Sequence, residues 1–129
     1  MFSDTVGTTE KSGYTRDDEN IISWTSIDGV GGIVALTSVW FEVRPGGWQV
    51  VEFDIVFDSD DSWAIGSVTD KFDVENVAAH EVGHTLFLDD LYRDKTAKLT
   101  MYGYVGYGEI KKRTLGVGDE LGIQKLYGE

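Results

Sequence analysis

The sequence predicts a single α+β domain, because segments with strand periodicity are followed by segments with helical periodicity. Residues 33–43 and 48–57 are rich in β-branched and aromatic side chains, which is typical of strands. Residues 74–86 place apolar side chains at helical spacing, and a second helical pattern opens at Asp119. A chain of 129 residues is long enough for one modest core and too short for two full domains.

The predicted domain spans residues 20–129 and follows a polar arm, residues 1–19, in which few side chains can pack. A short apolar piece, Ile21 to Trp24, comes first, and the glycine-rich residues 28–32 then predict a turn. Residues 33–43 form the next predicted strand.

Pro45 and the glycines after it end that strand, and residues 48–57 resume the pattern with apolar and polar side chains alternating. We therefore expect a hairpin with one buried face. Its acidic end, Phe57 to Ser62, predicts a turn, and a loop is expected from Trp63 to about Phe72.

A helix is predicted from about Val74 to Leu86, with Asp73 as its N-cap and Glu75 in its first turn, where a carboxylate suits the helix dipole. A long loop then leads from Asp90 to about Gly118. Within it, the basic run of residues 111–113 is interpreted as an exposed loop. Asp119 and Glu120 open the closing helix.

The net charge of −12 makes nucleic acid and anionic lipid surfaces unfavourable partners, because the surface repels phosphate groups. Without cysteine there is neither a disulfide framework nor a thiolate metal site, so a metal would bind through His, Asp or Glu. No apolar run approaches the roughly 20 residues of a membrane span, and residues 1–10 lack the regions of a signal peptide.

The two histidines of the chain both lie in the segment His80-Glu81-Val82-Gly83-His84, on the predicted helix. Four residues at about 100° each bring His84 over His80, so both imidazoles can bind one ion, with Glu81 beside the water of that ion. Zinc is the natural occupant. The alternative is a helix that carries two ordinary surface histidines.

A catalytic zinc site needs a third protein ligand in addition to the two histidines. Asp90 is the leading candidate, and it can reach the metal only if the chain turns near residue 87, because a continuing helix would carry it about 9 Å along the axis. Asp89, Glu109 and a site with no third protein ligand remain as alternatives.

A family resemblance rests on two motifs. Residues 80–90, HEVGHTLFLDD, resemble the extended zinc motif of the metzincin proteases, and in particular the matrixins, with Asp as third ligand as in snapalysin-like enzymes. Residues 99–104, LTMYGY, resemble the methionine turn of that family, in which Met101 would lie beneath the metal. Residues 115–128 are similar to its closing helix, and the resemblance covers about residues 20–128.

This resemblance implies a small twisted mixed sheet, an active-site helix, a methionine turn and a C-terminal helix. It also implies a secreted, monomeric zinc endopeptidase in which His80, His84 and Asp90 bind zinc and Glu81 is the general base for a zinc-bound water. Extended peptide substrate would pair with an edge strand and enter a specificity pocket, and calcium would bind in the acidic turn. The edge strand is assigned to Ile33, Val34, Ala35 and Leu36. The specificity pocket is assigned to Gly103, Tyr104 and Val105, and calcium binding to Asp58, Asp60 and Asp61. From the residues alone, an ordinary core strand and a solvated acidic turn without calcium remain as alternatives.

The chain departs from the family pattern at two places. Phe87 stands where the family has glycine, and a side chain there is costly if the backbone φ is positive. Residues 1–19 are too short and too polar to supply the strand and long helix that begin the family fold, so we expect both to be lacking. A catalytically impaired or truncated zinc- and peptide-binding module is therefore the main rival. A calcium-stabilised adhesive β domain is a third interpretation.

Overall fold

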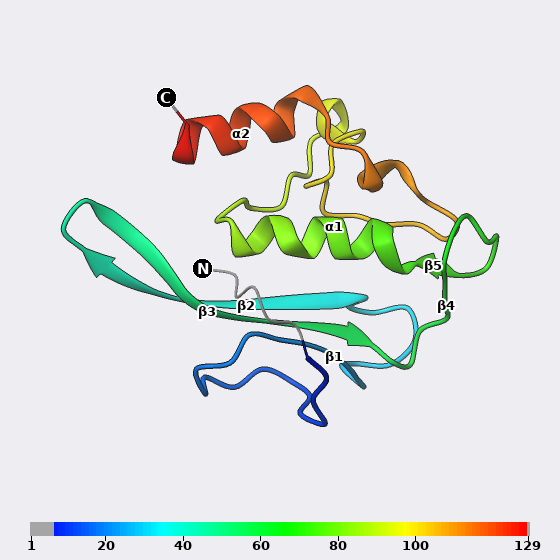
Figure 1. The fold of residues 1–129 in the computed structure, drawn as a ribbon. Helices are drawn as coiled ribbons and strands as arrows, with labels where there is room; N and C mark the ends of the chain where they lie inside the picture. Colours follow the sequence, from blue (N-terminus) through cyan, green and yellow to red (C-terminus); the bar gives the residue numbers. More distant parts are fainter. Residues whose placement is uncertain (1–6, 129) are drawn as a thin grey trace. The chain divides into compact units, whose positions relative to one another are not determined.

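The computed structural model describes residues 7–128 and divides into two compact units, Met1–Asp60 and Asp61–Glu129. The first unit is a β-sheet, and the second contains the helices with a short two-stranded sheet (Figure 1). The predicted α+β class, with a small mixed sheet and a C-terminal helix, is confirmed. The boundary predicted at residue 20 stays a prediction.

The sheet of the first unit contains β1 (Ile21–Thr25), β2 (Ala35–Arg44) and β3 (Gly47–Asp58) in the order β1-β3-β2. The central strand β3 pairs with β1 in parallel and with β2 in antiparallel orientation, which makes the sheet mixed. The predicted hairpin is therefore present as β2 and β3. Its turn uses Gly46 and Gly47 at positive φ, a conformation that costs glycine little because it has no Cβ.

The prediction that β3 has one buried face is wrong. Every residue from Glu52 to Asp58 is buried, including the side chains that were expected to face water. Glu52 is 1% exposed and Asp54 is fully buried. Buried carboxylates are costly unless hydrogen-bond donors surround them. The hydrogen-bond partners of Glu52 and Asp54 therefore explain how this face of β3 can be buried.

The donors are backbone N–H groups of the segment that precedes β1 and of Ile21, the first residue of that strand. Glu52 accepts hydrogen bonds from the N–H groups of Asp17 and Asp18, at 2.9 and 2.8 Å. Asp54 accepts from those of Thr15 and Ile21, at 2.9 and 3.0 Å. Burial raises the pKa of Asp54, and the two N–H groups oppose that shift. The part of the predicted arm that is described has no regular secondary structure, but it is fixed to β3.

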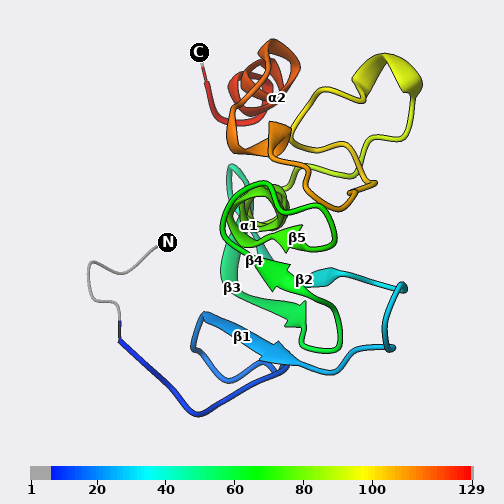
Figure 2. The ribbon, with the colours of Figure 1, turned by 90° about the vertical axis from the view of Figure 1, so that its right-hand side faces the viewer.

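The second unit contains β4 (Trp63–Ala64), β5 (Phe72–Asp73), α1 (Val74–Thr85) and α2 (Val117–Tyr127), with short 3₁₀ turns at Asp94–Thr96 and Lys111–Arg113. Figure 2 shows both α-helices close to end-on. The loop predicted between Trp63 and Phe72 is bounded by β4 and β5, which pair in parallel. Strands of two residues have no periodicity that a sequence pattern could reveal. No helix among residues 7–128 combines the length and the apolar character needed to cross a lipid bilayer.

Candidate metal centre

The start of α1 is fixed by Asp73, as predicted for its N-cap. The Asp73 carboxylate accepts the N–H of Asn76 at 2.9 Å and forms a two-pronged ion pair with Arg113 at 2.6 and 2.7 Å. The Arg113 guanidinium lowers the pKa of Asp73 to about 2, so this fully buried carboxyl stays ionised at neutral pH. The first turn of the helix therefore has a fixed position relative to Arg113.

The two histidines lie one helical turn apart and their rings meet edge to face, with 4.8 Å between centroids. His80 Nδ1 lies 2.8 Å from the carbonyl oxygen of Thr100, and His84 Nδ1 lies 2.7 Å from that of Leu88. A carbonyl oxygen can only accept, so each Nδ1 carries the proton. In the neutral ring the lone pair available for a metal is then on Nε2, which is the arrangement usual for metal-binding histidines.

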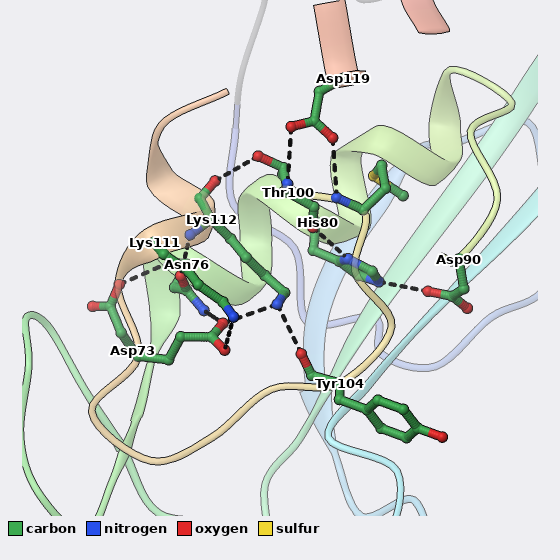
Figure 3. A network of polar contacts seen from close by, with 11 residues as sticks. Asp73, Asn76, His80, Asp90, Thr100, Tyr104, Lys111, Lys112 and Asp119 are labelled. Carbon is green, nitrogen blue, oxygen red and sulfur yellow. Dashed lines mark hydrogen bonds and ion pairs between the residues drawn. The ribbon is translucent and has the colours of Figure 1, made fainter. Parts of the chain in front are cut away.

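Asp90 completes a group of three ligand atoms. Its Oδ1 lies 2.9 Å from His80 Nε2 (Figure 3). The same oxygen lies 3.4 Å from His84 Nε2, and the two Nε2 atoms are 3.2 Å apart. Tetrahedral zinc with bonds of 2.0–2.1 Å requires ligand atoms about 3.3 Å apart. The donor set and its spacing thus fit zinc, with the Asp90 side chain 35% exposed beside the buried His80.

A tight turn after α1 brings Asp90 to this group. The helix ends at Thr85 with Leu86 as its C-cap. The N–H of Phe87 then binds the carbonyl of His84 at 3.0 Å, and the N–H of Leu88 binds the carbonyl of Gly83 at 3.2 Å. This pair of bonds defines a Schellman motif, whose first residue after the cap adopts positive φ. Phe87 has φ +64°, so the turn predicted near residue 87 places a phenylalanine in the conformation that favours glycine.

Met101 packs against α1 where that helix has no side chain. A Cβ added to Gly83 would lie 2.2 Å from the sulfur of Met101, which is 3% exposed. The flanking backbone is also fixed, because the N–H of Leu91 binds the carbonyl of Met101 and the N–H of Gly103 binds the carbonyl of Leu91, both at 2.8 Å. The backbone of residues 101–103 therefore pairs with Leu91, the residue that follows Asp90.

Asp119 of α2 holds the same segment from another direction. Its carboxylate accepts the N–H groups of Thr100 and Met101, at 2.9 and 3.2 Å (Figure 3). It also accepts the N–H of Gly116 at 2.9 Å. The carbonyl of Thr100 in turn orients His80. The sequence predicted Asp119 only as a helix-opening residue, and no local pattern shows that its carboxylate reaches the methionine turn.

Tyr92 is a further residue that the sequence did not single out. The negative charge of Asp90 raises the pKa of the Tyr92 hydroxyl, which also hydrogen-bonds that carboxylate. The Tyr92 ring packs edge-on against Tyr104, with 5.2 Å between centroids, and fills the space that a side chain at residue 103 would need. Two of the predicted pocket residues, Gly103 and Tyr104, therefore contact Tyr92, which binds Asp90.

The predicted general base lies on α1, and the predicted substrate-binding residues 33–36 lie around the start of β2. Glu81 is 5% exposed and follows His80 on α1. Ile33 and Val34 precede β2, and Ala35 and Leu36 are its first two residues. β2 is the last strand in the order β1-β3-β2. Among residues 7–128, one group of three candidate metal ligands is found, and it consists of His80, His84 and Asp90.

The carboxylates predicted to bind calcium have other contacts at the end of β3. Asp58 accepts the N–H of Asp60 at 2.9 Å, and Asp60 accepts the hydroxyl of Ser26. Backbone N–H groups lower the pKa of Asp58 against the opposing effect of burial. Asp61 is 7% exposed. Calcium binding at these residues remains a prediction.

The third ligand can be tested with three carboxylate-to-amide changes. We expect Asp90→Asn to weaken zinc binding most, because Asp90 alone of the three candidates joins the histidine group. Asp89→Asn is the adjacent control. Glu109→Gln should have little effect, since the Glu109 carboxylate binds Asn76 and Lys112 at 2.8 and 2.9 Å. Competition titration with a chromophoric chelator measures the three affinities, and the greatest loss in Glu109→Gln would exclude the present ligand set.

The turn strain at Phe87 leads to a second test. A left-handed conformation costs a residue with a Cβ about 1–2 kcal/mol, so Phe87→Gly should tighten zinc binding, up to about thirtyfold. Phe87→Ala is the matched control, because it also removes the half-buried ring but keeps the Cβ. The same titration compares the three proteins. Equal affinities for the Gly and Ala variants would show that strain at this turn does not limit the metal site.

Comparison with known proteins is consistent with this geometry. The family model Peptidase M10, described as matrixin, matches residues 13–128. The chain is also similar to the macrophage metalloelastase of Oryctolagus cuniculus, with 35% identity over 104 residues. That alignment includes 80% of this chain and 20% of the relative, so the chain spans about a fifth of the length of the protein it matches.

Proposed function

The chain belongs to the matrixin family of peptidases, and on this basis we propose that it is a zinc-dependent endopeptidase that cleaves internal bonds of extended peptides. The observation that carries the proposal is the convergence of His80 Nε2, His84 Nε2 and Asp90 Oδ1. Two neutral imidazoles and a carboxylate are a usual ligand set for a catalytic zinc, and they leave a position open for chemistry.

His80, His84 and Asp90 would hold the zinc, which would supply Lewis-acid chemistry by lowering the pKa of a water to about 7 and by polarising a carbonyl group. The residues of the chain supply the remaining functions. Glu81 accepts the proton of the attacking water and passes it to the leaving amine. Thr100 and Leu88 keep both histidines in the tautomer that presents Nε2 to the metal.

The substrate is proposed to be a peptide in extended conformation that pairs with β2. In support, β2 stands at the end of the order β1-β3-β2, so one of its sides faces away from β3. Addition of a strand supplies main-chain hydrogen bonds without requiring a particular sequence, which suits an endopeptidase. Gly103, Tyr104 and Val105 are proposed to form the wall of the specificity pocket. Secretion and a monomeric state complete the proposal.

A binding module without turnover is the second candidate, and the positive φ of Phe87 is the observation that favours it. Strain in the turn before Asp90 would weaken the third ligand without removing either histidine. Such a protein would bind zinc and peptide but would not cleave the peptide.

A zinc analysis combined with a cleavage assay tests both candidates. Purified protein is expected to contain zinc, to digest casein or a quenched fluorescent peptide, to stop in 1,10-phenanthroline and to recover when zinc is added back. Zinc in the protein without cleavage would support the binding module. Cleavage that continues after complete zinc removal would exclude the metal-dependent mechanism.

A further inference from the structure

Lys112 is a buried lysine outside the metal centre. Its side chain is 1% exposed, although the sequence predicted this basic run to be an exposed loop. The Nζ atom donates to the carbonyl oxygen of Tyr104 at 2.8 Å and pairs with Glu109 at 2.9 Å (Figure 3). A buried ammonium group is costly unless partners of this kind surround it, so its contacts must be well defined.

The same residue is connected to α1 and to the methionine turn through its backbone. Its N–H donates to the Oδ1 of Asn76 at 2.8 Å, and its carbonyl accepts the hydroxyl of Thr100 at 3.1 Å. Asn76 is fully buried and donates its Nδ2 to Glu109 at 2.8 Å. Lys112 thus joins the first turn of α1, the residue that orients His80, and the segment around Tyr104.

We propose that Lys112 is a positioning residue that sets the conformation of residues 102–110, and thereby the substrate selectivity of the wall formed by Gly103, Tyr104 and Val105. The hydrogen bond from Nζ fixes the direction of the Tyr104 peptide plane, which determines how this segment follows the methionine turn. The effect on selectivity rests on the proposed peptidase function. Lys112 is not a catalytic residue, because its ammonium group is enclosed by Tyr104, Glu109 and the ring of Tyr102.

Stability alone does not account for a lysine at this position. A buried ion pair contributes little net stability, and apolar side chains of similar volume often replace such a pair without loss. What an apolar side chain cannot do is donate a hydrogen bond to the Tyr104 carbonyl. The conformation of this segment is therefore the property that depends on the ammonium group.

Lys112→Met tests the proposal, because methionine has a similar length and no donor. The matched control is Lys111→Met, since Lys111 lies beside Lys112, is within 3.6 Å of Glu109 and stands over the same Tyr102 ring. The hydrogen bond to the Tyr104 carbonyl, in contrast, comes from Lys112. Hydrogen exchange followed by mass spectrometry reports on the conformation of residues 102–110. A peptide series that varies only the residue after the scissile bond reports on selectivity.

In Lys112→Met we expect backbone exchange of residues 102–110 to rise about tenfold, with α1 and the zinc content unchanged. The kcat/KM ratio between the best and the poorest peptide should fall about tenfold, whereas Lys111→Met should match the wild type. Unchanged exchange in Lys112→Met, or an equal rise in Lys111→Met, would overturn the proposal. So would an equal loss of kcat/KM for every peptide, because that result indicates a purely structural role.

If Lys112→Met does not fold, the variant Lys112→Met/Glu109→Gln removes the unpaired carboxylate as well and is judged by the same criteria. If the wild type cleaves no peptide, the proposed function fails, and the exchange of residues 102–110 alone decides whether Lys112 positions them.

Discussion

Replacing Glu81 with glutamine is expected to leave the zinc content unchanged and to lower peptide cleavage by about 10² to 10⁴. The amide preserves the size of this buried side chain but cannot accept the proton of the attacking water. Because Glu81 is not one of the three converging ligands, the metal should stay bound. The measurement is kcat/KM on a fluorescent peptide, together with zinc per chain by elemental analysis.

Glu75→Gln is the matched control for this experiment. Glu75 lies in the first turn of the same helix, its side chain is 63% exposed, and its contact is an ion pair with Arg113. The same change of charge should therefore leave cleavage close to that of the wild type. Near-normal cleavage by Glu81→Gln with normal zinc content would remove Glu81 from the mechanism.

The double variant His80→Ala/His84→Ala should lose its zinc and all metal-dependent cleavage. Two of the three ligand atoms disappear, and a lone carboxylate that is partly exposed does not retain zinc at micromolar concentrations of the free ion. Alanine favours the helix, so α1 should still form, which circular dichroism can verify. An unchanged zinc stoichiometry in this variant would refute the metal assignment.

Each single histidine variant should give an intermediate result, with His80→Ala the more damaging. His80 is buried and joins Thr100 of the methionine turn to Asp90, whereas His84 has a side chain 22% exposed. Loss of His80 therefore removes a ligand and also leaves the Thr100 carbonyl without its imidazole partner. Zinc affinities of the two single variants test this order.

The sequence predicted the elements whose cause is local. The N-cap Asp73, the helical spacing of the histidines and the break at Pro45 each act within a few residues, and each predicted element is present. The turn at residue 87 was also predicted, because a straight helix could not bring Asp90 to the histidines. A glycine or proline, a helix cap or a helical repeat is sufficient to predict an element when the cause lies within a few residues along the chain.

The features that the sequence did not reveal depend on partners far along the chain. Glu52 and Asp54 alternate with apolar residues and were predicted to face water, but N–H groups more than 30 residues earlier enclose them. Lys112 was predicted to be exposed because its neighbours are basic, whereas its contacts include Asn76, 36 residues away. Burial of a charged residue cannot be predicted from its own segment when remote groups compensate it.

The attachment of residues 15–21 to Glu52 and Asp54 determines which substitutions this segment can accept during evolution. All four hydrogen bonds come from main-chain N–H groups, so the carboxylates recognise a path of the backbone and not its side chains. The exposed residues Thr15 and Asp17 can therefore vary among descendants of this chain while the attachment is kept. Ile21 is more restricted, because its side chain is buried. Proline is the substitution that this attachment forbids, because it is the one residue with no hydrogen to offer.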